Sequence, residues 1–419
     1  MTALATDLSR RLIEGVDTDR LVRTASDLVN IPSFTGAEQA AAEYVRDCLA
    51  EEGMKASLQM VESGRANALG RIDGSGGGQC LMFNGHLDTS YSGNEPWLTG
   101  PGFKPNATIA DGRIWGLGIS NMKGAVACYI EVVRVLREAG VKLCGDLMVA
   151  GVCGEIEKTQ FSDDFSGAEY RGYGAGSRFL SMFGGAAADV CILGEPTENR
   201  VVTGHFGTLW ARLSVGGPFM HTAWSVGHLD ENSIVRLHRA MPQILDWVRE
   251  WSEIGREGSV EGVVNIGAVR GGFAWRLSRT PGQTDLFLDI RVPPSMRVQT
   301  AAAHFKNLVR DLNQKFPECE FESELFVTAP GSSIAVDHPV VGAIARAHAQ
   351  VFGQQAEHEV ARWYCDGGAL SRYGIQTVVY GASSGLPSPL GENLSIEELT
   401  ATCQAYVLAA VDICEVSAS

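Results

Sequence analysis

Three short polar clusters along the chain carry side chains that could bind a metal ion or move a proton. His86 and Asp88 follow one apolar run, Glu155 and Glu157 follow a second, and Glu195 follows a third. Because ligand sites in open α/β sheets lie beyond the carboxyl ends of the strands, the three clusters could converge at one edge. One imidazole with several carboxylates suits borderline and hard divalent cations. The residue types and spacing therefore indicate a metal site with carboxylates available for proton transfer.

His86 and Asp88 are separated by one residue, so both side chains lie on the same face of an extended segment. Asp88 could then lie behind His86 and orient its ring, as carboxylates do for metal-bound imidazoles. Each residue alone has a simpler explanation. A histidine after a strand is often a structural hydrogen-bonding group, and Glu195, which precedes Pro196, could cap a helix or a turn. The joint pattern favours the metal site.

The segments around these clusters have the pattern of an α/β protein. Apolar runs predict buried strands at 80–84, 147–153 and 190–193, each ending just before one of the polar clusters. Helical spacing of apolar residues and the position of prolines predict the flanking helices. These helices are expected at 18–31, 36–49, 121–138, 339–351 and 396–414, with a further strand at 376–380.

The middle of the chain has a different order of predicted strands and helices. Strands are predicted at 208–215, 262–269, 285–292 and 320–327, and helices at 232–251 and 300–313. Since the α/β pattern returns after this segment, the simplest organisation is a second compact unit inserted into the first. A chain of 419 residues is also long enough for two hydrophobic cores.

Composition excludes several classes of function. With 45% apolar and 20% charged residues the chain is typical of a globular protein, and no apolar stretch is long enough for a membrane span. The net charge of −15 argues against a nucleic-acid partner, because such binding depends on clustered Lys and Arg. The first residues lack the pattern of a secretory signal, so we expect a cytoplasmic protein. The ten cysteines form no CxxC pair and are expected to be reduced core thiols.

Six motifs in order give the chain a family resemblance. They are FNGHLDT (83–89), GLGISNMKGAVA (116–127), GVCGEIEKT (151–159), LGEPT (193–197), SVGGPFMHTAWSVGHLDENSI (214–234) and LDIRVPP (288–294). The sequence resembles the M20 family of metallopeptidases and deacylases, which includes acetylornithine deacetylase, succinyl-diaminopimelate desuccinylase and carboxypeptidase G2. The resemblance implies a mixed-sheet, zinc-peptidase-like α/β catalytic domain over 1–206 plus 325–419. It also implies an inserted α+β dimerisation, or lid, domain over 207–324, and hence a homodimer.

The resemblance also implies roles for single residues. His86, Asn121 and Glu195 would bind metal, Glu155 would be the general base, and Asp88 would support His86. His221 would reach a substrate oxygen, in the active site of the partner subunit. The expected substrate-binding residues are Arg291, Asn232 and Arg276. Arg291 could instead form a salt bridge on the surface or at an interface, and Asn121 could serve as a structural hydrogen-bonding group.

The sequence departs from the family pattern at three ligands. Asn121 stands where the family has a bridging aspartate, and Ile156 where it has an acidic residue. The last family ligand is a histidine near the C-terminus, yet the matching stretch SSGLPSPLGENLSIEE (383–398) has none and His358 is the last histidine. The two ligands lost outright belong to the same second metal in the family. We therefore expect one divalent ion per chain, manganese, zinc or cobalt; Glu157 could replace a lost ligand only if the offset of one residue did not point it away.

The expected function is hydrolysis of a carbon–nitrogen bond in a small carboxylate-bearing substrate, with Glu155 taking the proton from water. The bond is either the amide of an N-acyl amino acid or, since the family includes aminohydrolases, the ring amine of an aromatic amino acid such as a nitroanthranilate. Phe273, Trp275 and Arg276 could stack on and neutralise a flat carboxylate, or could instead be core residues near a hinge. The rival hypothesis is a catalytically silent homologue that binds a ligand or a partner.

Overall fold

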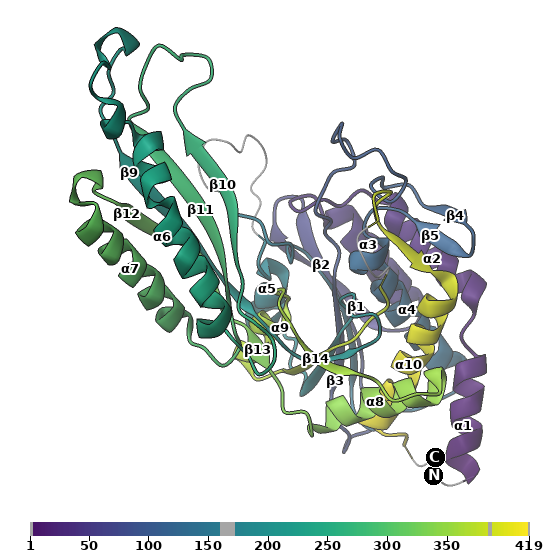
Figure 1. Ribbon diagram of the computed structural model, residues 1–419. Helices are drawn as coiled ribbons and strands as arrows, with labels where there is room; N and C mark the ends of the chain where they lie inside the picture. The colour runs from purple at the N-terminus through teal and green to yellow at the C-terminus, as the bar shows by residue number, and fades with distance from the viewer. Residues whose placement is uncertain (1–2, 160–171, 384–387, 418–419) are drawn as a thin grey trace. The chain divides into compact units, whose positions relative to one another are not determined.

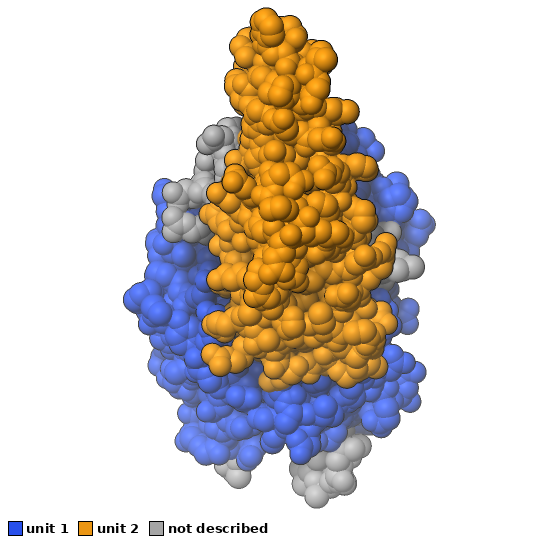
Figure 2. All heavy atoms as spheres, turned by 60° about the vertical axis from the view of Figure 1, so that its left-hand side comes forward, with its two compact units in different colours: residues 1–204, 334–359, 365–419 blue, residues 205–333, 360–364 orange. Residues whose placement is uncertain are grey.

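The computed structural model describes residues 3–159, 172–383 and 388–417, and the chain divides into two compact units, coloured separately in Figure 2. The first unit comprises residues 1–204, 334–359 and 365–419, and the second comprises 205–333 and 360–364. The insertion predicted from the sequence spans 207–324. Its predicted end falls inside strand β12 (Glu322–Ala329), which pairs with β9 (Gly207–Gly216) of the second unit.

A mixed sheet forms the centre of the first unit, with the strand order β1-β2-β6-β3-β7-β15-β8. Strand β3 pairs in parallel with β6 and β7, and β15 pairs in parallel with β7, whereas β2 runs antiparallel to β1 and β6. This arrangement confirms the predicted α/β class. The strands are β1 (Lys55–Glu62), β2 (Arg65–Ile72), β3 (Leu81–His86), β6 (Leu147–Val152), β7 (Val190–Leu193), β15 (Gln376–Val379) and β8 (Val201–His205).

The helices of the first unit cover both faces of the sheet. In Figure 1, α3, α4 and α10 lie on one side of it, and α5 and α9 lie on the other. The bounds are α1 (Ala3–Glu14), α2 (Thr18–Asn30), α3 (Gln39–Glu51), α4 (Gly124–Glu138), α5 (Ala175–Phe183), α8 (Pro339–Phe352), α9 (Gly367–Leu370) and α10 (Ile396–Cys414). A short irregular turn, η1 (Ile119–Lys123), precedes α4, and a small sheet joins β4 (Thr108–Ala110), β5 (Arg113–Trp115) and β16 (Asn393–Ser395).

Alternation along β3 decides which side chains enter the core. Phe83 points toward α4, where its ring stacks on Tyr129 with centroids 4.9 Å apart. Gly85 lies on the same face, and a Cβ there would approach Val126 to 2.8 Å, so only glycine lets α4 pack this closely. Since successive side chains of a strand alternate, Asn84 and His86 point to the opposite face. The core contacts of β3 therefore fix the direction of His86.

The second unit has its own antiparallel sheet, in the order β10-β11-β9-β12. Leu209 and Leu213 of β9 and Leu286 and Ile290 of β11 are fully buried in its core, together with Phe305. The remaining strands are β10 (Val264–Gly271) and β11 (Gln283–Val292), and the helices are α6 (Ser233–Ile254) and α7 (Val298–Lys315), with short turns η2 (Thr222–Trp224) and η3 (Leu229–Glu231). Strand β10 is an edge strand, and most of its side chains are exposed.

Two sequence-based expectations about the whole chain have structural counterparts. All ten cysteines are free thiols, and eight of them are buried, as expected for reduced core residues. None of the helices in the described part of the chain combines the length and the apolar content that crossing a lipid bilayer requires.

A buried ion pair joins the start of α3 to the start of β2. Both oxygens of Glu38 accept hydrogen bonds from the Arg65 guanidinium, at 2.9 and 3.0 Å, and the two side chains are almost completely inaccessible. Removing one member of a buried pair is costly because the other charge remains without compensation. The pair is therefore a sensitive point of the first unit.

Replacing Arg65 by Met is expected to lower the free energy of unfolding by roughly 3–5 kcal/mol, because the Glu38 carboxylate would stay buried without a cation. Equilibrium urea unfolding followed by circular dichroism measures the change. Arg10→Met is the matched control, since the Arg10–Asp7 pair is exposed and should contribute less than about 1 kcal/mol. Equal losses in the two variants would contradict the assigned importance of burial.

Candidate metal site

Three neighbouring strands deliver the candidate ligands to one place. His86 is the last residue of β3, Glu155 follows the end of β6, and Glu195 follows the end of β7. Because β6, β3 and β7 are adjacent and parallel, their carboxyl ends lie side by side. One ligand atom from each of the three residues lies within 4.8 Å of the others, and all three side chains are buried. The convergence expected from the sequence is therefore present.

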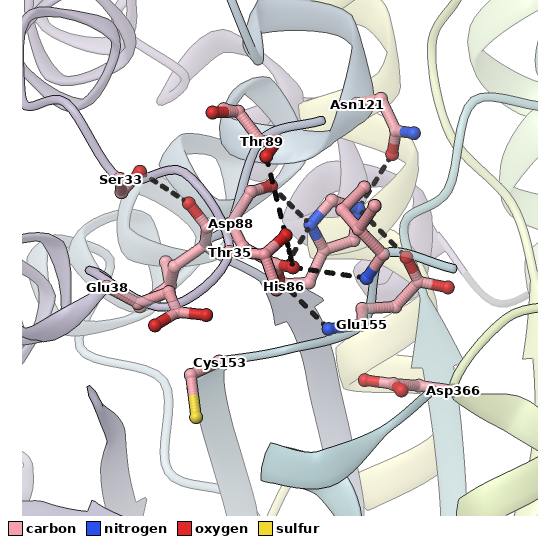
Figure 3. Close-up of polar contacts among 12 residues, drawn as sticks. Ser33, Thr35, Glu38, His86, Asp88, Thr89, Asn121, Cys153, Glu155 and Asp366 are labelled. Carbon is pink, nitrogen blue, oxygen red and sulfur yellow. Dashed lines mark hydrogen bonds and ion pairs between the residues drawn. The ribbon is translucent and has the colours of Figure 1, made fainter. Parts of the chain in front are cut away.

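The ring of His86 is held on both sides (Figure 3). Its Nδ1 lies 2.9 Å from the main-chain oxygen of Asp88 and 3.5 Å from the Asp88 carboxylate, and its Nε2 lies 2.8 Å from Oδ1 of Asn121. If Nδ1 donates to Asp88, Nε2 has a lone pair that faces a carbonyl oxygen, and a proton or a cation must lie between two such acceptors. Carboxylate oxygens of Glu155 and Glu195 lie 3.7 and 3.8 Å from the same Nε2.

Asp88 supports the site mainly through the loop that carries Glu155. Its carboxylate accepts hydrogen bonds from the backbone N–H groups of Glu155 and Ile156, at 3.0 and 3.1 Å, and from the Thr35 hydroxyl at 2.9 Å. The sequence predicted that this carboxylate would orient the His86 ring. In the structure the closer contact to the ring comes from the main-chain oxygen of Asp88, and the carboxylate fixes the neighbouring loop.

Burial and crowding of charge shift every titrating group in the site. Burial and then the charge of Glu195 raise the pKa of Glu155 well above its usual range. Burial also raises the pKa of Glu195 to about 7, although His86 opposes the shift. For His86, burial alone would lower the pKa, but the surrounding carboxylates outweigh it and raise the pKa well above the usual value. The pocket thus favours a positive charge between its carboxylates.

The donor set fits a divalent cation. One imidazole nitrogen, two carboxylates and an amide oxygen are ligands that manganese, zinc and cobalt accept. Glu195 Oε1 is buried and has no hydrogen-bond partner among the described residues, so this oxygen lacks the compensation that buried polar atoms normally have. A cation held by His86, Glu195 and the Asn121 amide, beside the Glu155 carboxylate, would supply that compensation.

The departures from the family pattern are visible in the site. Asn121 lies in the non-helical turn before α4 and points its amide oxygen at His86. Ile156 is buried and contributes its backbone N–H to Asp88 in place of a ligand side chain. Glu157 is near enough for its charge to raise the pKa of Glu195, after burial and nearer charges. Of the stretch 383–398, residues 384–387 lie outside the described residues.

Two carboxylates near the site were not predicted from the sequence. Asp366 immediately precedes α9, is buried, and accepts a hydrogen bond of 2.6 Å from Ser177 of α5. Burial raises the pKa of Asp366 to about 6, and its charge in turn raises the pKa of Glu155 and Glu195. The second, Glu392, bonds to the backbone of Asn121. Neither residue follows one of the three apolar runs, so the pattern that predicted the site gave no signal for them.

The remaining predicted residues lie in the second unit. His221 is partly exposed, and its Nδ1 accepts a hydrogen bond from Ala223 N at 3.1 Å. Asn232 caps α6 by accepting from Ile234 N at 2.9 Å. Arg291 pairs with Asp289 of the same strand at 2.7 Å, and both side chains are partly buried. Arg276 is exposed.

Aromatic side chains of the second unit lie on its surface. The exposed fractions of Phe273 and Trp275 are 53% and 78%, and their rings contact each other with centroids 5.4 Å apart. Nearby in the same unit, the Arg279 guanidinium lies 5.4 Å from the centre of the Phe219 ring. The alternative that Phe273 and Trp275 are core residues is wrong for this unit, because neither is buried.

Comparison with known proteins gives a family match. A family model described as peptidase family M20/M25/M40 matches residues 82–412. The acetylornithine deacetylase of Vibrio parahaemolyticus serotype O3:K6 (strain RIMD 2210633) is 26% identical over 329 residues, which cover 77% of this chain and 80% of that protein.

Solved structures share the fold. An M20 family metallo-carboxypeptidase from Sulfolobus solfataricus aligns with a TM-score of 0.73 and 15% identity, covering 94% of this chain and 100% of that chain. Aminopeptidase PepT from Bacillus cereus ATCC 10987 aligns with a TM-score of 0.72 and 18% identity, covering 96% and 100%.

Replacing Glu195 by Gln is expected to stabilise the metal-free protein at high pH. The pKa of Glu195 rises from 4.5 to about 7 on folding, so between these pH values the folded chain retains a proton that the unfolded chain has lost. Stability therefore falls as the pH rises through this window, by about 3 kcal/mol in total. The neutral amide escapes this loss, so the variant should exceed the wild type above pH 7 and match it below pH 4.5.

Urea unfolding of chelator-treated protein across this pH range measures the effect. Glu157→Gln is the control, because Glu157 is only partly buried. A wild-type protein that is more stable than Glu195→Gln above pH 7 would mean that Glu195 is a structural partner of His86, and would argue against a cation ligand.

Proposed function

Since the chain belongs to peptidase family M20/M25/M40, we propose that it is a metal-dependent hydrolase that cleaves a carbon–nitrogen bond of a small carboxylate-bearing substrate with one divalent ion per chain. Family membership confirms the resemblance inferred from the six motifs and makes the protein an M20 hydrolase. The observation that carries the proposal is the buried cluster of His86, Glu155 and Glu195, whose ligand atoms lie within 4.8 Å of one another.

The proposed chemistry divides between the cation and Glu155. A divalent ion held by His86, Glu195 and the Asn121 amide would acidify water and stabilise developing oxyanion charge. Glu155 would accept the proton of the attacking water and return it to the leaving nitrogen. A carboxylate in a buried pocket is a stronger base than one in water, which suits this task. Asp88 would hold the Glu155 backbone in place throughout.

A single ion is supported by the residues around the cluster. Ile156 offers no ligand atom from its side chain, and Asn121 offers an uncharged oxygen where a bridging carboxylate would neutralise two cations. Two carboxylates, Glu155 and Glu195, then balance the charge of one divalent ion. The oxygen-rich shell with one imidazole is compatible with manganese, zinc or cobalt.

Two substrate classes are supported by different observations. The similarity to proteins named acetylornithine deacetylase favours the amide of an N-acyl amino acid. The exposed Phe273–Trp275 pair and the neighbouring Arg276 favour an aromatic amino acid whose ring amino group is exchanged for a hydroxyl group from water, with release of ammonia. In both cases Arg276, Arg291 and Asn232 are the proposed partners of the substrate carboxylate.

We also propose a homodimer formed through the second unit. Strand β10 lies at the edge of its sheet, and the unit carries exposed apolar side chains such as Val269. His221, whose Nδ1 is engaged by Ala223 N, would present Nε2 to a substrate oxygen in the partner's active site.

Metal content and turnover test the function together. Wild-type protein reconstituted with manganese, zinc or cobalt should hold one ion per chain by elemental analysis and should hydrolyse N-acyl amino acids or aromatic amines. His86→Ala should lose the ion. Glu155→Gln should keep the ion and lose roughly 10²–10⁴-fold in kcat, because the general base is gone. Glu157→Gln is the matched control and should remain near wild type in both measurements.

Each unexpected outcome has a definite meaning. Two ions per chain would contradict the single-ion proposal. Full activity in Glu155→Gln would remove Glu155 from its role. A chain that binds a ligand but no metal, and turns over nothing, would instead be the catalytically silent homologue.

Mixing two inactive variants tests the dimer and the role of His221. If His221 completes the partner's site, a dimer of one His221→Ala subunit and one Glu155→Gln subunit contains one intact site. Random exchange makes half of the dimers mixed, so the mixture should regain about one quarter of wild-type activity. No recovery, with subunit exchange verified by differently tagged chains, would place His221 in its own subunit's site. Full activity of His221→Ala alone would place His221 outside the site.

A further inference from the structure

Glu392 contacts the turn that presents Asn121 to the site. One oxygen of its carboxylate, Oε2, accepts hydrogen bonds from the backbone N–H groups of Ser120 and Asn121, at 3.2 and 3.1 Å. A single side chain from the C-terminal part of the chain thus satisfies successive donors of a turn more than 270 residues away.

The backbone of Glu392 is anchored independently of its side chain. Its N–H bonds to Gly102 O at 3.1 Å, and its carbonyl oxygen accepts from Gly116 N at 3.2 Å. A Cβ on Gly102 would come within 2.2 Å of Glu392 N, and Gly391 has a φ of +88°, so both glycines are needed for this approach. The backbone that carries the Glu392 side chain is therefore held in place.

The turn that Glu392 binds is closed by two backbone hydrogen bonds, from Ile119 N to Gly116 O at 3.2 Å and from Lys123 N to Gly118 O at 2.8 Å, and the Glu392 carboxylate adds to them. Asn121 and Met122 depart from helical geometry, with φ of −125° and −138°, immediately before α4. Backbone N–H groups before the first helical turn have no partner within the helix. The Glu392 carboxylate provides that partner, and the Asn121 side chain on the same residue lies 2.8 Å from His86.

We propose that Glu392 is a positioning residue for the metal site, an inference that rests on the proposed metal-dependent function. Glu392 holds the backbone of residues 118–121 so that the amide oxygen of Asn121 faces the cation beside His86. It acts through Asn121 and does not touch the ion. The role needs an acceptor oxygen at this point more than it needs a charge, because a single oxygen receives both bonds from Ser120 and Asn121.

Mn²⁺ affinity, measured by calorimetric titration of the metal-free full-length protein, tests the proposal without relying on turnover. Glu392→Ala should weaken Mn²⁺ binding about 10–100-fold, the usual effect of losing a group that orients a ligand. Glu392→Gln keeps an acceptor oxygen and should bind Mn²⁺ more nearly as the wild type does. In a double-mutant cycle, Glu392→Ala should add little to Asn121→Ala, because both changes remove the same ligand.

Glu398→Ala is the matched control. Glu398 follows in the same segment and also accepts a backbone N–H, from Ser383 at 3.1 Å, but makes no contact with the 118–121 turn in any bond described. It should leave Mn²⁺ affinity unchanged. If Glu392→Ala does not fold, Glu392→Met, which fills the space without a strong acceptor, takes its place.

The outcomes separate this inference from the function on which it rests. A wild-type protein that binds no Mn²⁺, Zn²⁺ or Co²⁺ overturns both. Wild-type binding with unchanged affinity in Glu392→Ala overturns the positioning role alone. The positioning role is also overturned if the loss of Mn²⁺ affinity in Glu392→Ala adds fully to the loss in Asn121→Ala, because Glu392 would then act independently of Asn121. A loss that Glu392→Gln does not rescue would mean that its charge, and not its position, matters.

Discussion

Negative charge concentrated around one buried imidazole is the constraint on which the rest of the site depends. Three parallel strands end side by side. Glu155 and Glu195 follow two of these strands, and their carboxylates lie within 4 Å of His86 Nε2. Burying two carboxylates without compensation is costly, which is why burial raises the pKa of both. A divalent cation bound here would resolve this conflict, because it would compensate both carboxylates.

The same kind of contact holds the backbone of two residues of the candidate site, Glu155 and Asn121. Asp88 accepts the consecutive backbone N–H groups of Glu155 and Ile156, and Glu392 accepts those of Ser120 and Asn121. In each case a carboxylate that is distant in sequence fixes a turn at the end of an element, and so directs the side chain that the turn carries. The precision of the site therefore comes from backbone contacts as much as from the ligands.

The sequence predicted the parts of this arrangement that depend on local pattern. Strands β3, β6 and β7 are buried on both faces, so their residues form uninterrupted apolar runs, and the polar residues after them stand out. The hairpin of β1 and β2 was not predicted, because β1 is half-exposed and carries polar residues such as Lys55 and Gln59. Asp366 and Glu392 were not predicted because only the fold brings them near His86, and no local spacing reports that.

The replacement of family ligands in this chain is consistent with the balance of charge around His86. Asp88 has both carboxylate oxygens engaged by backbone and hydroxyl donors, so its charge is already partly compensated. Glu155 and Glu195 are the carboxylates that face Nε2 of His86, and the charge of Asp366 already acts on both of them. An aspartate at position 121 would add a third negative charge 2.8 Å from the same nitrogen, where the amide adds only a dipole. In the proposed one-ion site, where Ile156 supplies no ligand for a second ion, an uncharged oxygen at position 121 would avoid this further repulsion.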